Sequence, residues 1–115
     1  MKKVKQHKAA KTHEETWEDG VNTYLVGTKR GKVLDTAISV SVTVKQVDAA
    51  GAVVTVGGEP LECVESVTIR KAGLPDDAAG FVAGILRDAR QKALRDITAR
   101  RRALEAWELI PEGEE

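Results

Sequence analysis

The residues from Leu34 to Lys45 alternate strictly between two kinds of side chain, and this pattern limits the fold more than any other. Aliphatic and β-branched residues share one face of this run, and mainly small polar residues share the other. A period of two over such a length is typical of a half-buried antiparallel strand. The apolar face of a sheet built on this strand needs a cover.

Shorter alternating runs flank this strand and are separated by turn-forming residues. Gly31 suits a turn at 28–32 because glycine tolerates positive φ, and Gly51 suits the turn that follows the long strand. Gly57–Pro60 is expected to be a turn or a bulge, because Pro60 cannot donate to a central ladder. The sequence therefore predicts a four-stranded antiparallel meander, with strands at about 21–28, 33–47, 52–57 and 61–70.

One long helix at about 75–108 is expected to cover the sheet. Asp76 and Asp77 suit the positive N-terminal end of a helix. Apolar residues then repeat every three or four positions, which is the spacing of a helix with one buried face. These residues are Val82, Leu86, Ala89, Ala93, Ile97, Leu104 and Trp107. The predicted fold class is α+β, a meander packed by a long C-terminal helix.

This helix is longer than the sheet that it is expected to cover. It would span about 50 Å if continuous, whereas a compact chain of this length is roughly 35 Å across. Either the helix breaks near Gly80 and Gly84, or its C-terminal end projects. Projection is favoured because Arg100 lies within the apolar stripe, where an isolated chain would not bury it unpaired. We expect a protein–protein contact at this end, and we also assign Trp17 to it. The expected interface residues are Arg100, Leu104, Trp107, Leu109, Ile110 and Trp17.

Charges are segregated along the chain although the formal net charge is zero. Residues 1–13 carry five Lys and no acid, whereas 103–115 carry five Glu and no base. Such segregation favours surfaces that meet complementary surfaces, within one chain or between copies. We expect a flexible charged tail at 1–19, a single α+β domain at 20–110 and an acidic tail at 111–115.

The sequence holds few groups suited to catalysis. Cys63 lies on the apolar face of an expected strand, which favours a buried thiol over a nucleophile. His7 and His13 both fall in the expected tail. The segment 27–32 resembles a phosphate-binding loop poorly, because a strand is expected to follow it instead of a helix. We therefore expect no catalytic residue, no cofactor and no metal site, and a protein that is not an enzyme.

Two functions fit these expectations. The first is a non-enzymatic structural or assembly module, a subunit of a homo-oligomer or larger complex, with small virion components as an analogy of shape. The alternative is a nucleic-acid-binding accessory or regulatory protein that uses the basic segment 87–102 and the Lys-rich N-terminus. Its candidate phosphate contacts are Lys29, Arg30, Lys32, Arg87, Arg95 and Arg102. Zero net charge and few aromatic residues argue against it.

The expected partners are copies of this chain or a larger assembly, with nucleic acid as the alternative. No membrane contact is expected, because the apolar run 81–86 covers about a third of a bilayer. A single cysteine and a basic start without an apolar run indicate an intracellular, soluble protein. We expect it in the cytoplasm or in a particle assembled there.

Overall fold

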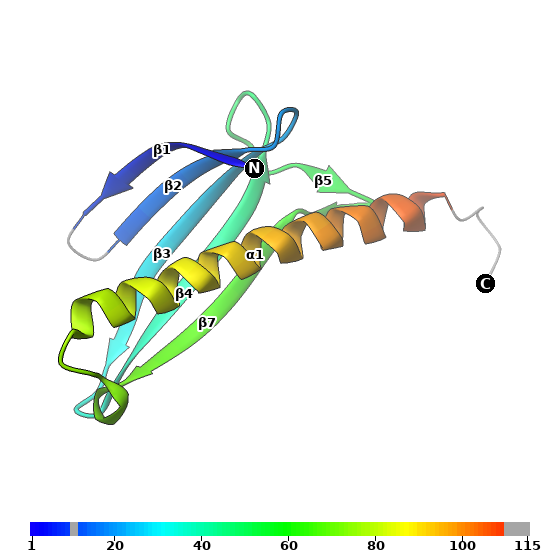
Figure 1. The fold of residues 1–115 in the computed structure, drawn as a ribbon. Helices are drawn as coiled ribbons and strands as arrows, with labels where there is room; N and C mark the ends of the chain where they lie inside the picture. Colours follow the sequence, from blue (N-terminus) through cyan, green and yellow to red (C-terminus); the bar gives the residue numbers. More distant parts are fainter. Residues whose placement is uncertain (10–11, 110–115) are drawn as a thin grey trace.

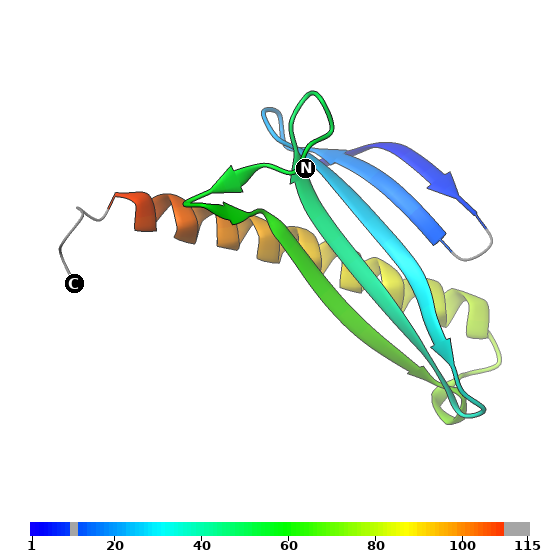
Figure 2. The same cartoon turned by 180° about the vertical axis from the view of Figure 1, so that it is seen from behind.

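In the computed structural model, which describes residues 1–9 and 12–109, an antiparallel sheet carries one long helix on one face (Figure 1). Five strands form this sheet in the order β1-β2-β3-β4-β7. Figure 2 shows that the opposite face of the sheet has no helix over it. The α+β class predicted from the sequence is confirmed. The elements are β1 (Lys2–Lys8), β2 (Thr12–Glu18), β3 (Thr23–Val33), β4 (Ala37–Val47), β5 (Thr55–Val56), β6 (Glu59–Pro60), β7 (Glu62–Arg70), η1 (Lys71–Gly73) and α1 (Ala78–Glu108).

The core lies between α1 and the middle of the sheet. In β4 the predicted inner face is the buried one, with Val42 and Val44 completely inaccessible to solvent. Ile97 of α1 is equally buried and packs against them in the same cluster. Full burial of one such side chain is worth about 1.5–3 kcal/mol. The cluster consists of Tyr24, Val26, Val42, Val44, Leu61, Ala93, Leu94 and Ile97.

The N-terminal segment extends the sheet, so the expected flexible tail at 1–19 is wrong. β1 pairs with β2, and β2 pairs with β3. The pairing places Lys2 opposite Glu18, and opposite charges on neighbouring strands contribute about 0.2–1 kcal/mol each. Trp17 also packs against the core cluster from β2. The lysines of β1 therefore face a strand that carries Glu14, Glu15 and Glu18 across one hairpin, and the sheet has five strands instead of four.

The strand expected at 52–57 is shorter than predicted and is not a full strand of the main sheet, to which only Val53 is bridged, through Val47. β5 pairs with β6 in a separate two-stranded sheet. Gly57 and Gly58 join them with φ angles of 61° and 79°, the geometry of a two-residue hairpin turn that glycine adopts without strain. The turn predicted at Gly57–Pro60 is thus confirmed, but it closes a small hairpin beside the end of α1.

Gly31 lies in a bulge, not in the turn expected at 28–32. β3 continues to Val33, with a register shift against β4 after Arg30. A Cβ atom on Gly31 would lie 2.7 Å from the Ser39 hydroxyl oxygen, so this close approach of the two strands requires glycine. The chain turns later, where Leu34 N–H donates to the Ala37 carbonyl at 2.8 Å. The second predicted strand therefore begins at Ala37 instead of residue 33.

α1 is continuous over 31 residues and does not break at Gly80 or Gly84. It begins after Asp77, whose carboxylate accepts a hydrogen bond from Gly80 N–H at 3.2 Å, as an N-cap residue does. Its length is about 46 Å at 1.5 Å per residue. The last turns consequently lie beyond the five-stranded sheet (Figure 1). None of the helices in the described part of the chain is long and apolar enough to cross a membrane.

Candidate functional site

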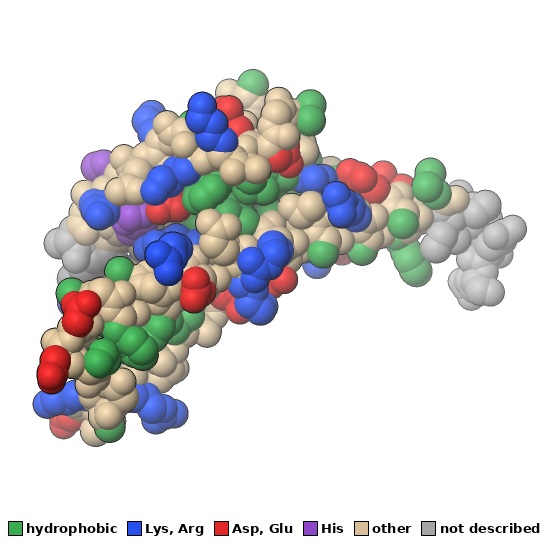
Figure 3. All heavy atoms as spheres, viewed as in Figure 1, with side chains coloured by type: hydrophobic (Ala, Val, Ile, Leu, Met, Phe, Trp, Pro, Cys, Tyr) green, Lys and Arg blue, Asp and Glu red, His purple; other side chains and the backbone are tan. Residues whose placement is uncertain are grey.

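The C-terminal end of α1 presents apolar side chains to solvent. Trp107 is 68% exposed and Leu109 is 82% exposed. Figure 3 shows hydrophobic side chains standing out along this end of the helix. Leu104 packs partly against the core cluster instead, and Ile110 lies outside the described residues. Trp107, which the helical repeat placed in the core-facing stripe, points away from the core, and we call Trp107 and Leu109 the projecting end.

The β5–β6 hairpin braces this part of α1. Gly57 N–H donates to the Glu108 carboxylate at 2.6 Å. Arg100 Nη2 lies 3.9 Å from the Glu59 carboxylate, whereas its Nε atom is buried without a hydrogen-bond partner. These two contacts join the last turns of α1 to the β5–β6 hairpin. The projecting end therefore continues from a helix end that is tied to a second segment of the chain.

Trp17, the remaining residue assigned to the interface, lies apart from the projecting end. It sits on the helix-facing side of β2 and packs against the core cluster. Its indole Nε1 donates to Glu15 Oε1 at 2.8 Å. These contacts stabilise the N-terminal hairpin on the body of the same chain.

The basic residues of segment 87–102 are divided among several environments. Arg90 and Arg101 turn inward, with only 14% and 13% of their side chains exposed. Lys92 Nζ lies 2.6 Å from the Glu65 carboxylate and 2.8 Å from that of Asp96. Glu65, an acid on the otherwise apolar face of β7, therefore has a basic partner in Lys92. The hydrogen bonds that Lys92 donates to the two carboxylates, that of Asp96 first, raise the pKa of Lys92.

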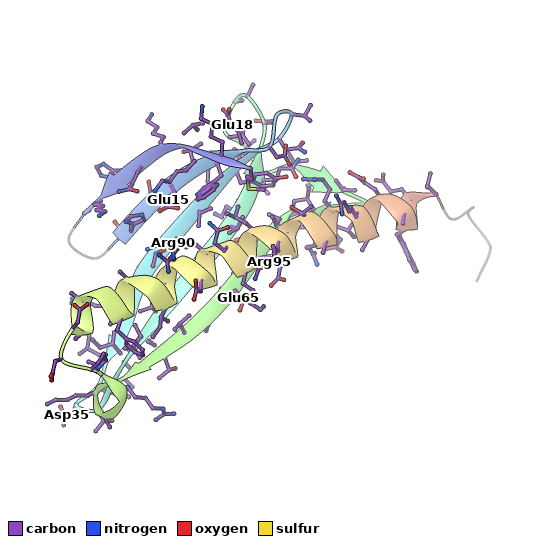
Figure 4. All side chains as sticks on the ribbon, viewed as in Figure 1. Glu15, Glu18, Asp35, Glu65, Arg90 and Arg95 are labelled. Carbon is purple, nitrogen blue, oxygen red and sulfur yellow. The ribbon has the colours of Figure 1, made fainter. Side chains whose placement is uncertain are left out.

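The six candidate phosphate contacts do not form one surface. Arg87, Arg95 and Arg102 are exposed on α1, and Figure 4 shows Arg95 on the helix. Lys29 lines a hollow of about 480 Å³ on the uncovered face of the sheet. Arg30 instead lines a cleft on the helix side. A phosphate backbone following the helix would therefore not meet Lys29, which lies on the other face of the sheet.

A buried carboxylate, Glu15, joins β2 to α1. Glu15 is 6% exposed, and its Oε2 atom lies 2.7 Å from His13 Nε2. The guanidinium of Arg90 lies 4.0 Å from the same oxygen, and Arg90 Nε donates to Thr28 Oγ1 at 2.8 Å. Figure 4 shows Glu15 and Arg90 on these facing elements. Burial acts to raise the Glu15 pKa, but hydrogen bonds from Trp17 and His13 and the Arg90 and Lys3 charges lower it overall.

A second polar cluster lies further along α1, around Tyr24. The Tyr24 hydroxyl donates to Asp19 Oδ2 at 2.7 Å and accepts a hydrogen bond from Arg101. Arg101 also donates to Gln46 Oε1 at 2.9 Å. Burial acts to raise the Asp19 pKa, but the hydrogen bonds from Tyr24 and from the Asn22 backbone and side chain outweigh it and lower the pKa to about 2.

This lowered pKa makes the stability of the fold depend on Asp19 in a defined pH range. Because the ordinary pKa is 3.8 and the folded value is about 2, the ionised carboxylate stabilises the fold fully above about pH 4. This contribution is lost as the pH falls through about 2. We expect Asp19→Asn to cost about 1–2 kcal/mol at pH 7.

Urea denaturation of both proteins between pH 7 and pH 2.5 checks this expectation. The difference in free energy of unfolding should shrink at the acid end, and a difference that stays constant contradicts it. Asp88→Asn is the control, because the Asp88 side chain is 81% exposed and its loss should matter little at any pH.

Cys63 and the histidines do not form a reactive pair. Cys63 is a free thiol that packs against the core cluster, and burial raises its pKa, which disfavours the thiolate. His13 is folded into β2 beside Glu15, not in a tail as expected. Among residues 1–9 and 12–109, no group of three or more His, Cys, Asp and Glu side chains is placed to hold a metal ion.

An apolar cleft opens at the other end of the molecule, between the first turns of α1 and the sheet. Its volume is about 570 Å³, within the range of small-molecule and side-chain binding sites. Its walls come from β1, β2, the β3–β4 hairpin, β7 and α1, and basic residues lie along its rim. The described apolar residues that line it are Ala9, Val33, Leu34, Ala37, Ile38, Val40, Ile69, Leu74, Val82 and Leu86.

Comparison with known proteins identifies no relative of this chain. The chain matches no known protein family, no curated protein and no solved structure.

Reasoning from the sequence missed both polar clusters and the cleft. A signal for the first cluster was present, because His13, Glu15 and Trp17 alternate with Thr12, Glu14 and Thr16. This alternation has the period of a strand. Its inner face is mostly polar, however, so the composition of the segment favours a flexible tail.

Proposed function

We propose that this chain is a non-enzymatic assembly module, a subunit of a homo-oligomer or of a larger particle in the cytoplasm. The exposed projecting end carries this proposal. A tryptophan that is 68% exposed on a braced helix end is the kind of rigid aromatic anchor that dominates protein–protein interfaces.

The shape of the molecule supports the same function. Its principal extents are 56 × 33 × 20 Å, so a long body carries the apolar group at one tip. The residues around Trp107 on the outer side of the helix are small, with Ala103 and Ala106 both exposed. A partner can therefore approach the helix closely on either side of the indole.

Light scattering of the purified protein across a concentration series tests the proposal. We expect a mass above that of the monomer that rises with concentration, and Trp107→Ala should weaken this association at least about 10-fold. Val64→Ala is the matched control, because Val64 is 61% exposed on the uncovered face of the sheet. A wild-type protein that stays monomeric at several hundred micromolar, or a Trp107→Ala variant that associates normally, contradicts it.

Nucleic-acid binding is the second candidate, supported by the exposed arginines Arg87, Arg95 and Arg102. Against it, Arg90 and Arg101 are turned inward and Lys92 is neutralised by Glu65 and Asp96. Adding duplex DNA at low and physiological salt to the same measurements separates the two candidates. DNA binding that falls steeply with salt, and that is lost when the three arginines are replaced, supports the second candidate.

A further inference from the structure

The apolar cleft and the projecting end lie at opposite ends of α1. Leu86 lines the cleft, and about 32 Å of helix separates it from Trp107 at 1.5 Å per residue. The helix between them is continuous, so Trp107 cannot enter the cleft of its own chain. Residues 110–115 span at most about 21 Å when extended, which is also too short for a return to the cleft.

The cleft combines an apolar interior with a basic rim. Val40 and Ile69 form buried parts of its wall, whereas Val33 and Leu34 are 57% and 53% exposed at its mouth. The basic residues that line it are Lys8, Arg30, Lys71 and Arg90, and Asp35 is the one acid among the described lining residues. An occupant that complements this surface is apolar where it enters and acidic where it meets the rim.

The sequence of the projecting end has the same order, with apolar residues first and acidic residues after them. Trp107 and Leu109 are exposed apolar side chains, and the chain continues through Ile110 and Pro111. Glu112, Glu114 and Glu115 follow with no basic residue among them. Apolar residues followed by acids match an apolar cleft surrounded by cations.

We propose that the apolar cleft receives the projecting end of a second copy of this chain. This inference rests on the assembly function proposed above and specifies its geometry. Trp107 and Leu109 enter between the β3–β4 hairpin and α1, and the acidic sequence that follows them is complementary in charge to Lys8, Arg30 and Lys71. Because the two surfaces differ, the contact is head-to-tail, and each copy offers one end and one cleft. Repeated in one direction, such a contact builds a closed ring or an open filament, and exchanged reciprocally between two copies it closes a two-fold dimer.

Two variants that each remove one half of the contact test this geometry. The end variant is Trp107→Ala/Leu109→Ala. The cleft variant is Val33→Glu/Leu34→Glu, which places acids at two positions more than half exposed. The matched control is Leu25→Glu/Val64→Glu, with comparable exposure on the opposite face of the sheet. Circular dichroism verifies that all three variants keep the wild-type fold.

The end variant alone and the cleft variant alone should each be monomeric by light scattering, with association weakened at least about 30-fold. An equimolar mixture of the end variant and the cleft variant should form a dimer and nothing larger, because one intact end and one intact cleft remain between them. The control should assemble as the wild type does.

Other outcomes overturn the inference and separate it from the assembly function. A cleft variant that still assembles, while the end variant does not, leaves the assembly function standing and excludes the cleft as its receptor. A mixture that stays monomeric shows that an intact end and an intact cleft do not bind each other, and overturns the inference. A wild-type protein that never associates removes both proposals.

Discussion

Replacing Glu15 with alanine should lower the free energy of unfolding by about 2–4 kcal/mol at neutral pH. Glu15 is 6% exposed and is held by groups from three different elements. Its carboxylate accepts from Trp17 and lies within 4.0 Å of Arg90 on α1. Removing it leaves a guanidinium that is only 14% exposed without its acidic partner. Breaking one side of such a pair costs more than the pair itself contributes.

Urea denaturation followed by circular dichroism measures this loss. Glu14→Ala is the matched control, because Glu14 is the adjacent acid and is exposed, so its loss should change stability by less than about 0.5 kcal/mol. Glu15→Gln should have an intermediate effect, because the amide keeps one acceptor but loses the charge. The folded pKa of Glu15 is below its ordinary value of 4.5. The gap between wild type and Glu15→Gln should therefore be full above that value and close as the pH falls below it.

If Glu15→Ala and Glu14→Ala were equally stable, the N-terminal hairpin would contribute little to the folded state. In that case β1 and β2 would be the flexible segment that the composition of residues 1–19 indicated. The experiment therefore also measures how firmly the outer two strands belong to the sheet.

Replacing Arg101 with alanine should destabilise the protein by a similar amount, about 2–4 kcal/mol. Arg101 donates to Tyr24 and Gln46, and lies 3.8 Å from the Asp19 carboxylate. Its guanidinium also lies 5.9 Å from the centre of the Tyr24 ring, within range of a cation–π contact. Loss of this side chain removes one hydrogen bond from Tyr24 and one from Gln46, and takes the positive charge away from Asp19.

Arg102→Ala is the control for this change, since Arg102 is the next residue and is exposed on α1. Its replacement should leave stability within about 0.5 kcal/mol of wild type. Arg101→Lys should recover part of the loss, because an ammonium keeps the charge near Asp19 but cannot reproduce the planar set of donors. Equal stability of Arg101→Ala and Arg102→Ala would show that the Tyr24 cluster does not hold α1 to the sheet.

The helix arginines show why a basic segment cannot be assigned to a function by counting charges. In the sequence, segment 87–102 is a run of cations suited to phosphates. In the fold, Arg90 and Arg101 stabilise the chain internally, and Lys92 neutralises Glu65 and Asp96. The helical period alone does not separate these residues from Arg95, because their side chains reach partners on strands distant in sequence.

Periodicity determined the parts of this structure in which one face is aliphatic. The alternation from Leu34 to Lys45 predicted the buried face of β4, and the repeat from Val82 to Ile97 predicted the buried side of α1. Both predictions follow because burial of apolar surface depends mainly on which residues share a face. The length of the helix likewise predicted an end beyond its sheet.

Only the tertiary structure decided where the polar residues belong. β1 and β2 join the sheet through opposed charges and a buried carboxylate, and their strength depends on distance, on burial and on partners from α1. The same holds for the ends of α1, since the β3–β4 hairpin forms part of the cleft at one end and the β5–β6 hairpin binds Glu108, next to Trp107, at the other. Hydrophobic patterning is a local property that a sequence shows directly, whereas polar pairing is a property of contacts that form when distant segments meet.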